Sequence, residues 1–146
     1  MSKSNVFEQD LLLHIFNNSN IGSIGDATGL RGSTVAGSFY VGLHTGDPGE
    51  AASQDISETA YTGYARVAVA RSGAGFTITG NSVSPAANID FGECTASPGA
   101  AITHFSIGTD STGSGYVLYK GTVTPNITVA VGVIPRLKTT STITED

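Results

Sequence analysis

The segment Phe39-Tyr40-Val41-Gly42-Leu43-His44-Thr45-Gly46-Asp47-Pro48-Gly49-Glu50 indicates the fold most directly. Its first half alternates large apolar side chains with Tyr, Gly and His, which is the pattern of a β-strand with one buried face. The strand must end at the Gly-Asp-Pro-Gly sequence, because Pro48 excludes the α region for Asp47 and Gly49 completes a turn. The segment therefore predicts a strand over residues 39–44 that ends in a sharp turn.

The rest of the chain repeats this arrangement of short alternating segments and glycine-rich turns. The further strands that it predicts are Tyr64–Arg71, Phe76–Thr79, Ser82–Pro85, Ile89–Phe91, Ile102–Ile107, Tyr116–Val123, Thr128–Ile134 and Leu137–Ile143. Gly80-Asn81 predicts a tight hairpin between two of them. Strands spaced about ten residues apart, with no helix between them, are typical of a sandwich or jelly roll. We therefore expect an all-β fold, a jelly-roll-like antiparallel β-sandwich.

A short N-terminal α-helix is predicted over residues 6–17, where Asn5 and Glu8 have the spacing of a capping box. Its apolar stripe consists of Phe7, Leu11, Leu12, Ile15 and Phe16. This stripe either packs on the domain's own sheet or docks on a neighbouring subunit. Residues 21–37 are expected to form a long ordered loop that makes contacts. We accordingly divide the chain into an arm, residues 1–37, and a β-sandwich domain, residues 38–146.

The composition excludes several classes of partner. Charged residues make up 13% of the 146 residues, against a usual value of about 25%, which favours a surface that partners cover. A net charge of −5 without a basic patch argues against nucleic acid and against anionic membranes. No apolar run approaches the about 20 residues that span a bilayer, and the N-terminus is not typical of a signal peptide. We expect a soluble protein that is made in the host cytoplasm.

No catalytic or metal-binding motif is found in the sequence. Cys94 is the only cysteine and is expected to be a buried apolar residue. The three histidines, His14, His44 and His104, have no ligand spacing among them. We interpret His104 as a half-buried structural residue, and His44 as a residue that stiffens the adjacent turn by a hydrogen bond. The sequence therefore predicts no enzyme activity, no metal and no cofactor. The segment Glu50–Thr62, with few large apolar residues, is expected to be a surface loop.

Two kinds of contact residue are predicted. Arg66 is expected to pair with an acid at the sheet edge. Tyrosines 64, 116 and 119 either pack within the domain or, together with Lys120, form a contact patch, since tyrosine combines a large apolar ring with a polar tip. The predicted protein-interface residues are Phe7, Leu11, Leu12, Ile15, Phe16, Tyr64, Tyr116 and Tyr119.

Three later motifs accompany the opening segment: Gly63-Tyr64-Ala65-Arg66, Thr103-His104-Phe105-Ser106-Ile107, and Leu118-Tyr119-Lys120. Together with it they resemble a group of small tailed-phage virion proteins. Members of that group are head decoration (cement) proteins or are labelled tail-fibre proteins. The resemblance spans roughly residues 39–133 and the N-terminal helix.

The resemblance implies a structural virion protein on the capsid exterior. Such a protein would decorate and stabilise the capsid by bridging adjacent subunits of the major capsid protein, and would form dimers or trimers. Two alternatives remain open. One is a tail-fibre or baseplate-associated protein involved in host attachment. The other is a small carbohydrate-binding β-sandwich module, against which the absence of Trp counts, because sugar-binding clefts rely on aromatic faces.

Overall fold

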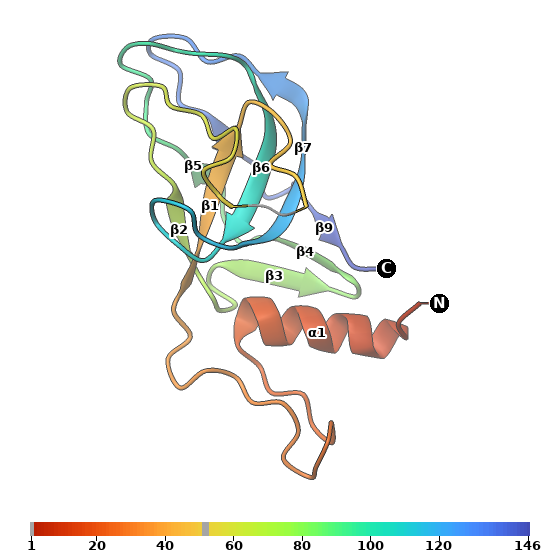
Figure 1. Ribbon diagram of the computed structural model, residues 1–146. Helices are drawn as coiled ribbons and strands as arrows, with labels where there is room; N and C mark the ends of the chain where they lie inside the picture. The colour runs from red at the N-terminus through yellow and green to blue at the C-terminus, as the bar shows by residue number, and fades with distance from the viewer. Residues whose placement is uncertain (1, 51–52) are drawn as a thin grey trace. The chain divides into compact units, whose positions relative to one another are not determined.

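The computed structural model describes residues 2–50 and 53–146. Across these residues one helix precedes nine strands (Figure 1): α1 (Asn5–Asn17), β1 (Ser38–His44), β2 (Val67–Ala70), β3 (Phe76–Thr79), β4 (Ser82–Pro85), β5 (Ile89–Asp90), β6 (Ile102–Gly108), β7 (Val117–Ile127), β8 (Arg136–Leu137) and β9 (Ile143–Thr144). The strands with a defined register pair antiparallel. The predicted all-β, sandwich-like fold with a short N-terminal helix is confirmed.

The chain forms two compact units. Unit 1 comprises Met1–Ser38, Ala70–Asn88 and Lys138–Asp146, and unit 2 comprises Phe39–Val69 and Ile89–Leu137. Unit 1 contains α1 and the sheet β3-β4-β9. Unit 2 contains the sheet β2-β1-β6-β7, apart from one end residue each of β1 and β2, and the pair β5-β8. The division at residues 37 and 38 stays a prediction.

In unit 1, α1 begins one residue earlier than predicted because Ser4, rather than Asn5, caps it. The Ser4 hydroxyl accepts a hydrogen bond from the backbone N–H of Phe7 at 3.4 Å. At the other end, Asn18 adopts the left-handed conformation with φ 57°, and its N–H bonds to the carbonyl of Leu13. This geometry is a usual end of a helix, and it stops α1 at Asn17.

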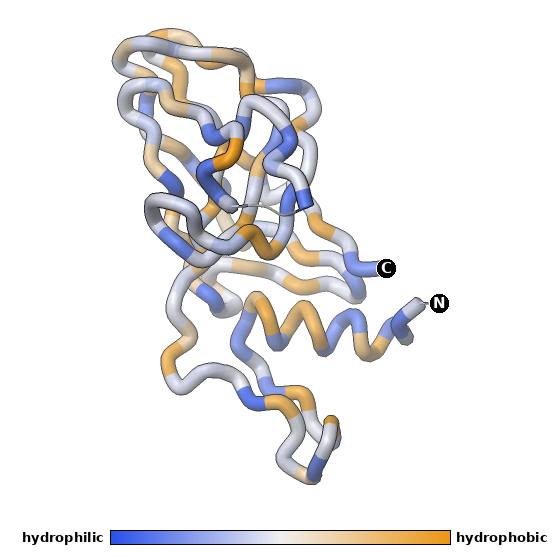
Figure 2. The backbone as a smooth tube through the Cα atoms, in the orientation of Figure 1, coloured by the Kyte–Doolittle hydropathy of each residue, from blue (hydrophilic) through white to orange (hydrophobic). Residues whose placement is uncertain are grey.

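The helix packs on the β3–β4 hairpin of its own unit. Leu12 and Phe16 are fully buried, and the Phe16 ring meets the Phe76 ring of β3 edge-on, with 4.9 Å between centroids. Figure 2 shows the alternation of apolar and polar residues along α1 that makes this packing favourable. The hairpin turns at Gly80, whose φ of 58° suits glycine. The predicted hairpin at Gly80-Asn81 is therefore confirmed.

Arg71 fastens the end of α1 to the loop that follows it. Its guanidinium donates hydrogen bonds to the backbone carbonyls of His14 and Ile15, and to the side chains of Asn18 and Ser33. The last carbonyls of a helix lack partners within the helix, so one side chain satisfies two of them here. Residues 21–37 form a loop as predicted.

Unit 2 has one apolar and one polar sheet face. Strand β1 pairs with β6 so that Val41 faces Ile107 and Leu43 faces Phe105. Paired residues share a face, and Val41, Leu43 and Ile107 are at most 5% exposed. The other buried apolar residues of the unit include Phe39, Tyr61, Ile89, Phe91, Cys94, Ile102, Val129 and Leu137. Burial of Cys94 confirms its interpretation as a small buried residue.

Two predicted strands are wrong. Residues 128–134 alternate in hydropathy but form no strand: Gly132 has φ 87°, and the N–H of Val133 bonds to the carbonyl of Ala130 in a turn. The predicted strand Leu137–Ile143 is divided between β8, which pairs with β5, and β9, which pairs with β4. Each part has only two residues.

The interpretation of residues 50–62 as a surface loop holds for most of the described residues of the segment, but three of them are buried. Gln54 is fully buried, and Thr59 and Tyr61 are 4% and 2% exposed. Residues 51 and 52 lie outside the described residues. Because the buried groups are mainly polar, the scarcity of large apolar residues gave no indication of burial.

Candidate functional site

The polar face of the unit 2 sheet carries a buried histidine–serine pair. Gly42 pairs with Ser106 and His44 with His104 across β1 and β6, which places these side chains on one face. His44 and Ser106 are both fully buried. His44 Nδ1 lies 2.9 Å from the carbonyl of Ile56 and must donate to it, so Nε2 accepts from the Ser106 hydroxyl at 2.8 Å.

These surroundings favour the neutral form of the His44 imidazole. Burial lowers the pKa of the imidazole below its usual value of 6.5, against smaller opposing effects of the Ile56 carbonyl and Glu58. A Ser–His pair is a familiar nucleophile and base. In this protein both residues are 0% exposed, and a carbonyl rather than a carboxylate orients the imidazole. The arrangement therefore fixes β1, β6 and the 53–59 segment together. The expectation that His44 stiffens the adjacent turn is wrong, because its two ring nitrogens bond to the carbonyl of Ile56 and the hydroxyl of Ser106 instead. His104 is half-buried as predicted.

A second, partly buried group is centred on Glu58. The Arg66 guanidinium donates to both carboxylate oxygens, at 2.7 and 2.8 Å, and the Tyr64 hydroxyl donates to one of them at 2.7 Å. Tyr64 in turn accepts from the N–H of Leu43 at 3.0 Å. The Glu58 hydrogen bond raises the pKa of Arg66, and burial raises the pKa of Tyr64. The predicted acidic partner of Arg66 is confirmed, and it is Glu58.

The other donors of Arg66 hold a loop between β6 and β7. We call residues 109–116 the tip loop. Arg66 donates to the carbonyls of Asp110 at 2.9 Å and Gly113 at 2.7 Å. The Gln54 side chain accepts from the N–H of Asp110 at 3.0 Å, and the Gln54 backbone N–H donates to the carbonyl of Gly115 at 2.9 Å. Two buried residues thus fix both ends and the middle of the tip loop.

Glycines make room for this clamp of Arg66 and Gln54. A Cβ on Gly115 would lie 2.4 Å from the Gln54 side chain, and a Cβ on Gly108 would lie 2.1 Å from it. Both distances are below 3.0 Å, which is shorter than the contacts that Cβ atoms make in proteins. Glycine is therefore required at Gly108 and Gly115 because the Gln54 side chain lies against their backbone.

The structure separates the predicted interface residues into exposed and buried groups. In unit 2, Tyr116 is 73% exposed, whereas Tyr64 and Tyr119 are half-buried. In unit 1, Leu12 and Phe16 belong to the unit's own core. The remaining stripe residues are Phe7, which is 37% exposed, and the half-buried Leu11 and Ile15.

Gln54, Glu58 and Ser106 had almost no signal in the sequence. Their burial could not be predicted because these side chains are polar, and hydrophobic periodicity detects only apolar cores. One signal was present: a charged Arg66 leading into an apolar strand requires a nearby acid, and Glu58 is eight residues away.

No metal or membrane site is found within residues 2–50 and 53–146. These residues contain no group of three or more His, Cys, Asp or Glu side chains placed to hold a metal ion. No helix among them combines the length and hydropathy needed to cross a membrane. The absence of a cofactor and of enzyme activity stays a prediction.

Comparison with known proteins identifies the family. The family model described as podophage GP4 fiber I protein gp80 matches residues 2–144. A search of curated proteins gave no match. Because the matched region includes both units and nearly the whole chain, this protein belongs to the podophage GP4 fiber I protein gp80 family, a family of phage structural proteins.

Proposed function

We propose that the protein is a structural subunit of a fibre-type appendage on the phage particle. The family match over residues 2–144 carries this proposal. The low charge content of 13% supports it, because a subunit that is covered by neighbours does not need a highly charged surface.

Self-association in the appendage, as dimers or trimers, is part of the proposal. Strand β7 lies at the end of its sheet and is 11 residues long, so it offers an extended edge for pairing. Apolar side chains nearby in sequence are exposed, including Tyr116 at 73% and Leu118 at 40%. Light scattering coupled to size-exclusion chromatography measures the oligomer directly, and a monomer at all concentrations would contradict this part.

Capsid decoration is the second candidate. It would place the protein on the capsid exterior, bridging adjacent subunits of the major capsid protein. The observation that favours it is the presence of exposed apolar residues in both units, such as Val6 and Val35 in unit 1 and Tyr116 and Val131 in unit 2. One chain could therefore contact two neighbours.

Fractionation of purified particles distinguishes the two candidates. Heads and tails are separated, and peptides of this protein are quantified against those of the major capsid protein by mass spectrometry with isotope-labelled standards. A fibre subunit is expected in few copies with the tail fraction. Many copies that remain with empty heads would favour decoration, and absence from purified particles would contradict both.

A further inference from the structure

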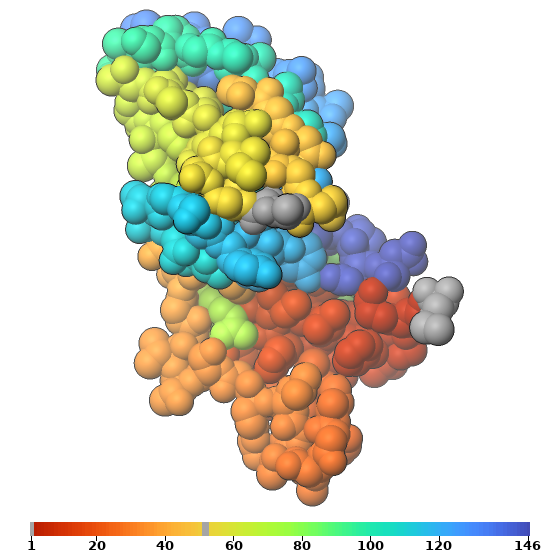
Figure 3. All heavy atoms as spheres, viewed as in Figure 1, coloured from red at the N-terminus to blue at the C-terminus, as the bar shows by residue number. Residues whose placement is uncertain are grey.

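Residues 138–146, which we call the strap, complete the sheet of unit 1 along β4. Strand β9 pairs antiparallel with β4, and Ile143 lies opposite Val83. Opposite residues share a face, and Val83 is 2% exposed, so Ile143 helps to cover it. In the neighbouring pair, the hydroxyl oxygens of Thr144 and Ser82 are 3.2 Å apart. Figure 3 shows the strap at the surface, in violet beside the red atoms of α1. Without the strap, β4 would be an edge strand.

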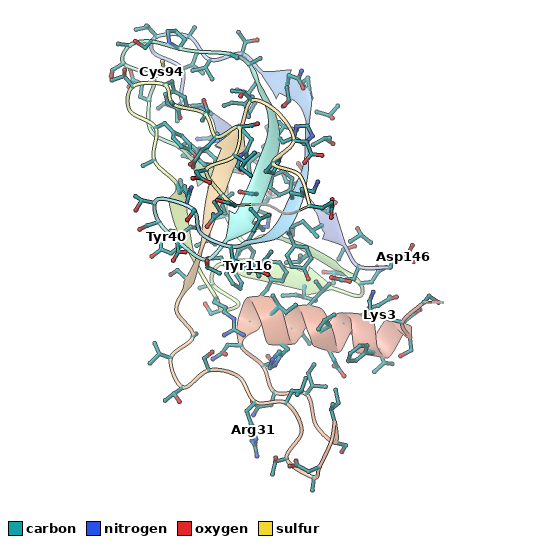
Figure 4. The ribbon with its side chains drawn as sticks, in the orientation of Figure 1. Lys3, Arg31, Tyr40, Cys94, Tyr116 and Asp146 are labelled. Carbon is teal, nitrogen blue, oxygen red and sulfur yellow. The ribbon has the colours of Figure 1, made fainter. Side chains whose placement is uncertain are left out.

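Polar groups from two other segments of unit 1 hold the last residues of the strap. The N–H of Glu145 donates to the carbonyl of Asn81 at 2.8 Å, and the Asn81 side chain donates to the carbonyl of Glu145 at 2.9 Å. Lys3, which precedes α1, lies 3.2 Å from the Glu145 carboxylate and donates to the carbonyl of Asp146 at 2.6 Å (Figure 4). The seat of the strap therefore consists of the edge of β4, the hairpin turn at Asn81 and the ammonium group of Lys3.

The strap is held by fewer contacts than the strands beside it. None of residues 138–146 is buried, and β9 has two residues whereas β3 and β4 have four each. The side chains of Lys3 and Glu145 are 29% and 16% exposed, and ion pairs that water reaches contribute little. The conformational entropy of every ordered residue opposes these contacts. Segments held in this way open locally while the rest of the fold stays intact.

The residues before β9 can serve as a hinge. Residues 138–142 read Lys-Thr-Thr-Ser-Thr and contain no apolar side chain, so their straightening exposes no apolar surface to water. In the closed strap they form a turn, in which the N–H of Ser141 donates to the carbonyl of Lys138 at 2.9 Å. These residues reach up to about 17 Å when extended. Opening of the turn would therefore carry β9 away from its own β4.

We propose that the strap detaches and that its seat on β4 takes the strap of a second copy of this chain. An exchanged strap makes all of the contacts described above again, because the residues on both sides are identical, and reciprocal exchange gives a closed dimer. Charge complementarity favours the same occupant. Glu145-Asp146 is the only pair of adjacent acidic residues in the sequence, and Lys3 is placed to meet it.

This exchange is independent of the proposed place of the protein in the particle. It also uses a different surface from the edge of β7, so either contact can form without the other. An experiment that reports only on the seat of the strap therefore separates the two.

Disulfide trapping between two variants of the full chain tests the exchange. One variant carries Ser82→Cys and the other carries Thr144→Cys, so the two new cysteines meet in the β4–β9 ladder only when the strap of one chain lies on the β4 of the other. The natural Cys94 is buried and does not compete. The variants are mixed and oxidised with glutathione disulfide, and mass spectrometry quantifies the peptide pair that joins positions 82 and 144.

We expect this pair to accumulate at least about fivefold faster than a collision control, since cysteines held together react faster than those that meet by diffusion. The control mixes Thr144→Cys with Val131→Cys, at a site that is 65% exposed. A single chain with both Ser82→Cys and Thr144→Cys should close an internal disulfide, which checks the geometry of the pair. Failure of that internal bond would overturn the seat, and a mixed pair no faster than the control would overturn the exchange.

Lys3→Ala tests whether the ion pair keeps the strap closed. The substitution is expected to speed the mixed disulfide about two- to fivefold, because opening no longer breaks the contact with Glu145. Lys120→Ala is the matched control, since Lys120 pairs with Asp47 and Glu50 in unit 2, and it should leave the rate unchanged. An equal rate in Lys3→Ala and in the wild type would contradict the role of Lys3 in closing the strap.

Discussion

Replacing Arg66 with Ala should strongly destabilise unit 2. The Arg66 side chain is 2% exposed and its partner Glu58 is 18% exposed. The substitution removes both hydrogen bonds to the carboxylate and both bonds to the carbonyls of Asp110 and Gly113. Glu58 is then left as a mostly buried carboxylate that keeps the hydrogen bond from the Tyr64 hydroxyl but has lost its charged partner.

The loss in the free energy of unfolding depends on which of the lost hydrogen bonds water can replace. Breaking a buried ion pair by removal of one partner costs about 3–5 kcal/mol. Asp110 and Gly113 are exposed, so water can satisfy their carbonyls, and Glu58 is not completely buried. We therefore expect the lower end of that range, about 3 kcal/mol. With a urea m-value of about 1–2 kcal/mol/M, the midpoint should fall by roughly 1.5–3 M.

Tyrosine fluorescence reports on unit 2 selectively. The chain contains five tyrosines and no tryptophan, and all five tyrosines lie in Phe39–Val69 or Ile89–Leu137. Urea titration followed by this signal therefore measures the unit that contains Arg66. Arg66→Lys keeps the charge but loses the two-pronged contact with the carboxylate, so an intermediate midpoint is expected.

An exposed arginine of the same unit provides the control. Arg136 pairs with Asp90, and their side chains are 50% and 46% exposed. Arg136→Ala should leave the urea midpoint almost unchanged, because exposed ion pairs contribute little. If Arg66→Ala lowered the free energy of unfolding by less than about 1 kcal/mol, the clamp would be energetically unimportant and our account of the polar face would be refuted.

Three further outcomes are expected. Arg71→Ala should destabilise unit 1 by about 2 kcal/mol, because two helix carbonyls lose a charged donor. Thermal unfolding followed by the helical circular dichroism signal measures this effect, and an unchanged melting temperature would contradict it. Unit 2 should lose stability as the pH falls from about 7.5 to about 5.5, because the folded-state pKa of His44 lies below 6.5 and the unfolded chain therefore binds more protons in this range. The tyrosine-detected urea midpoint measures this loss, and His44→Gln should make the midpoint less dependent on pH. An equal pH dependence in the wild type and in His44→Gln would show that another group is responsible. EDTA should not alter either transition, because the described residues offer no metal-ligand group; a melting temperature that drops in EDTA and recovers with one added metal would reveal a site that was missed.

The elements with strong local signals could be predicted from the sequence. The alternation in residues 39–44 and 102–107 predicted the two central strands of the unit 2 sheet almost to the residue. Gly80-Asn81 predicted the hairpin, since a left-handed glycine is needed there. These features depend on residues close together in the chain.

The errors have two causes, a local turn and long-range polar pairing. Residues 128–134 alternate as a strand does, but Gly132 and a turn divert them. Gln54 and Glu58 have no apolar pattern, and their burial depends on Arg66 and on the tip loop, which is distant from them in sequence. Tyr116 was predicted as a contact residue, but its rigid support comes from partners that periodicity cannot detect.

A cryo-electron microscopy reconstruction of the phage particle tests the central claim most directly. If the protein is an appendage subunit, its two units should each fit density in a fibre attached to the particle. Density for the protein at joints of the capsid lattice, and none in any fibre, would contradict that assignment and would favour capsid decoration instead.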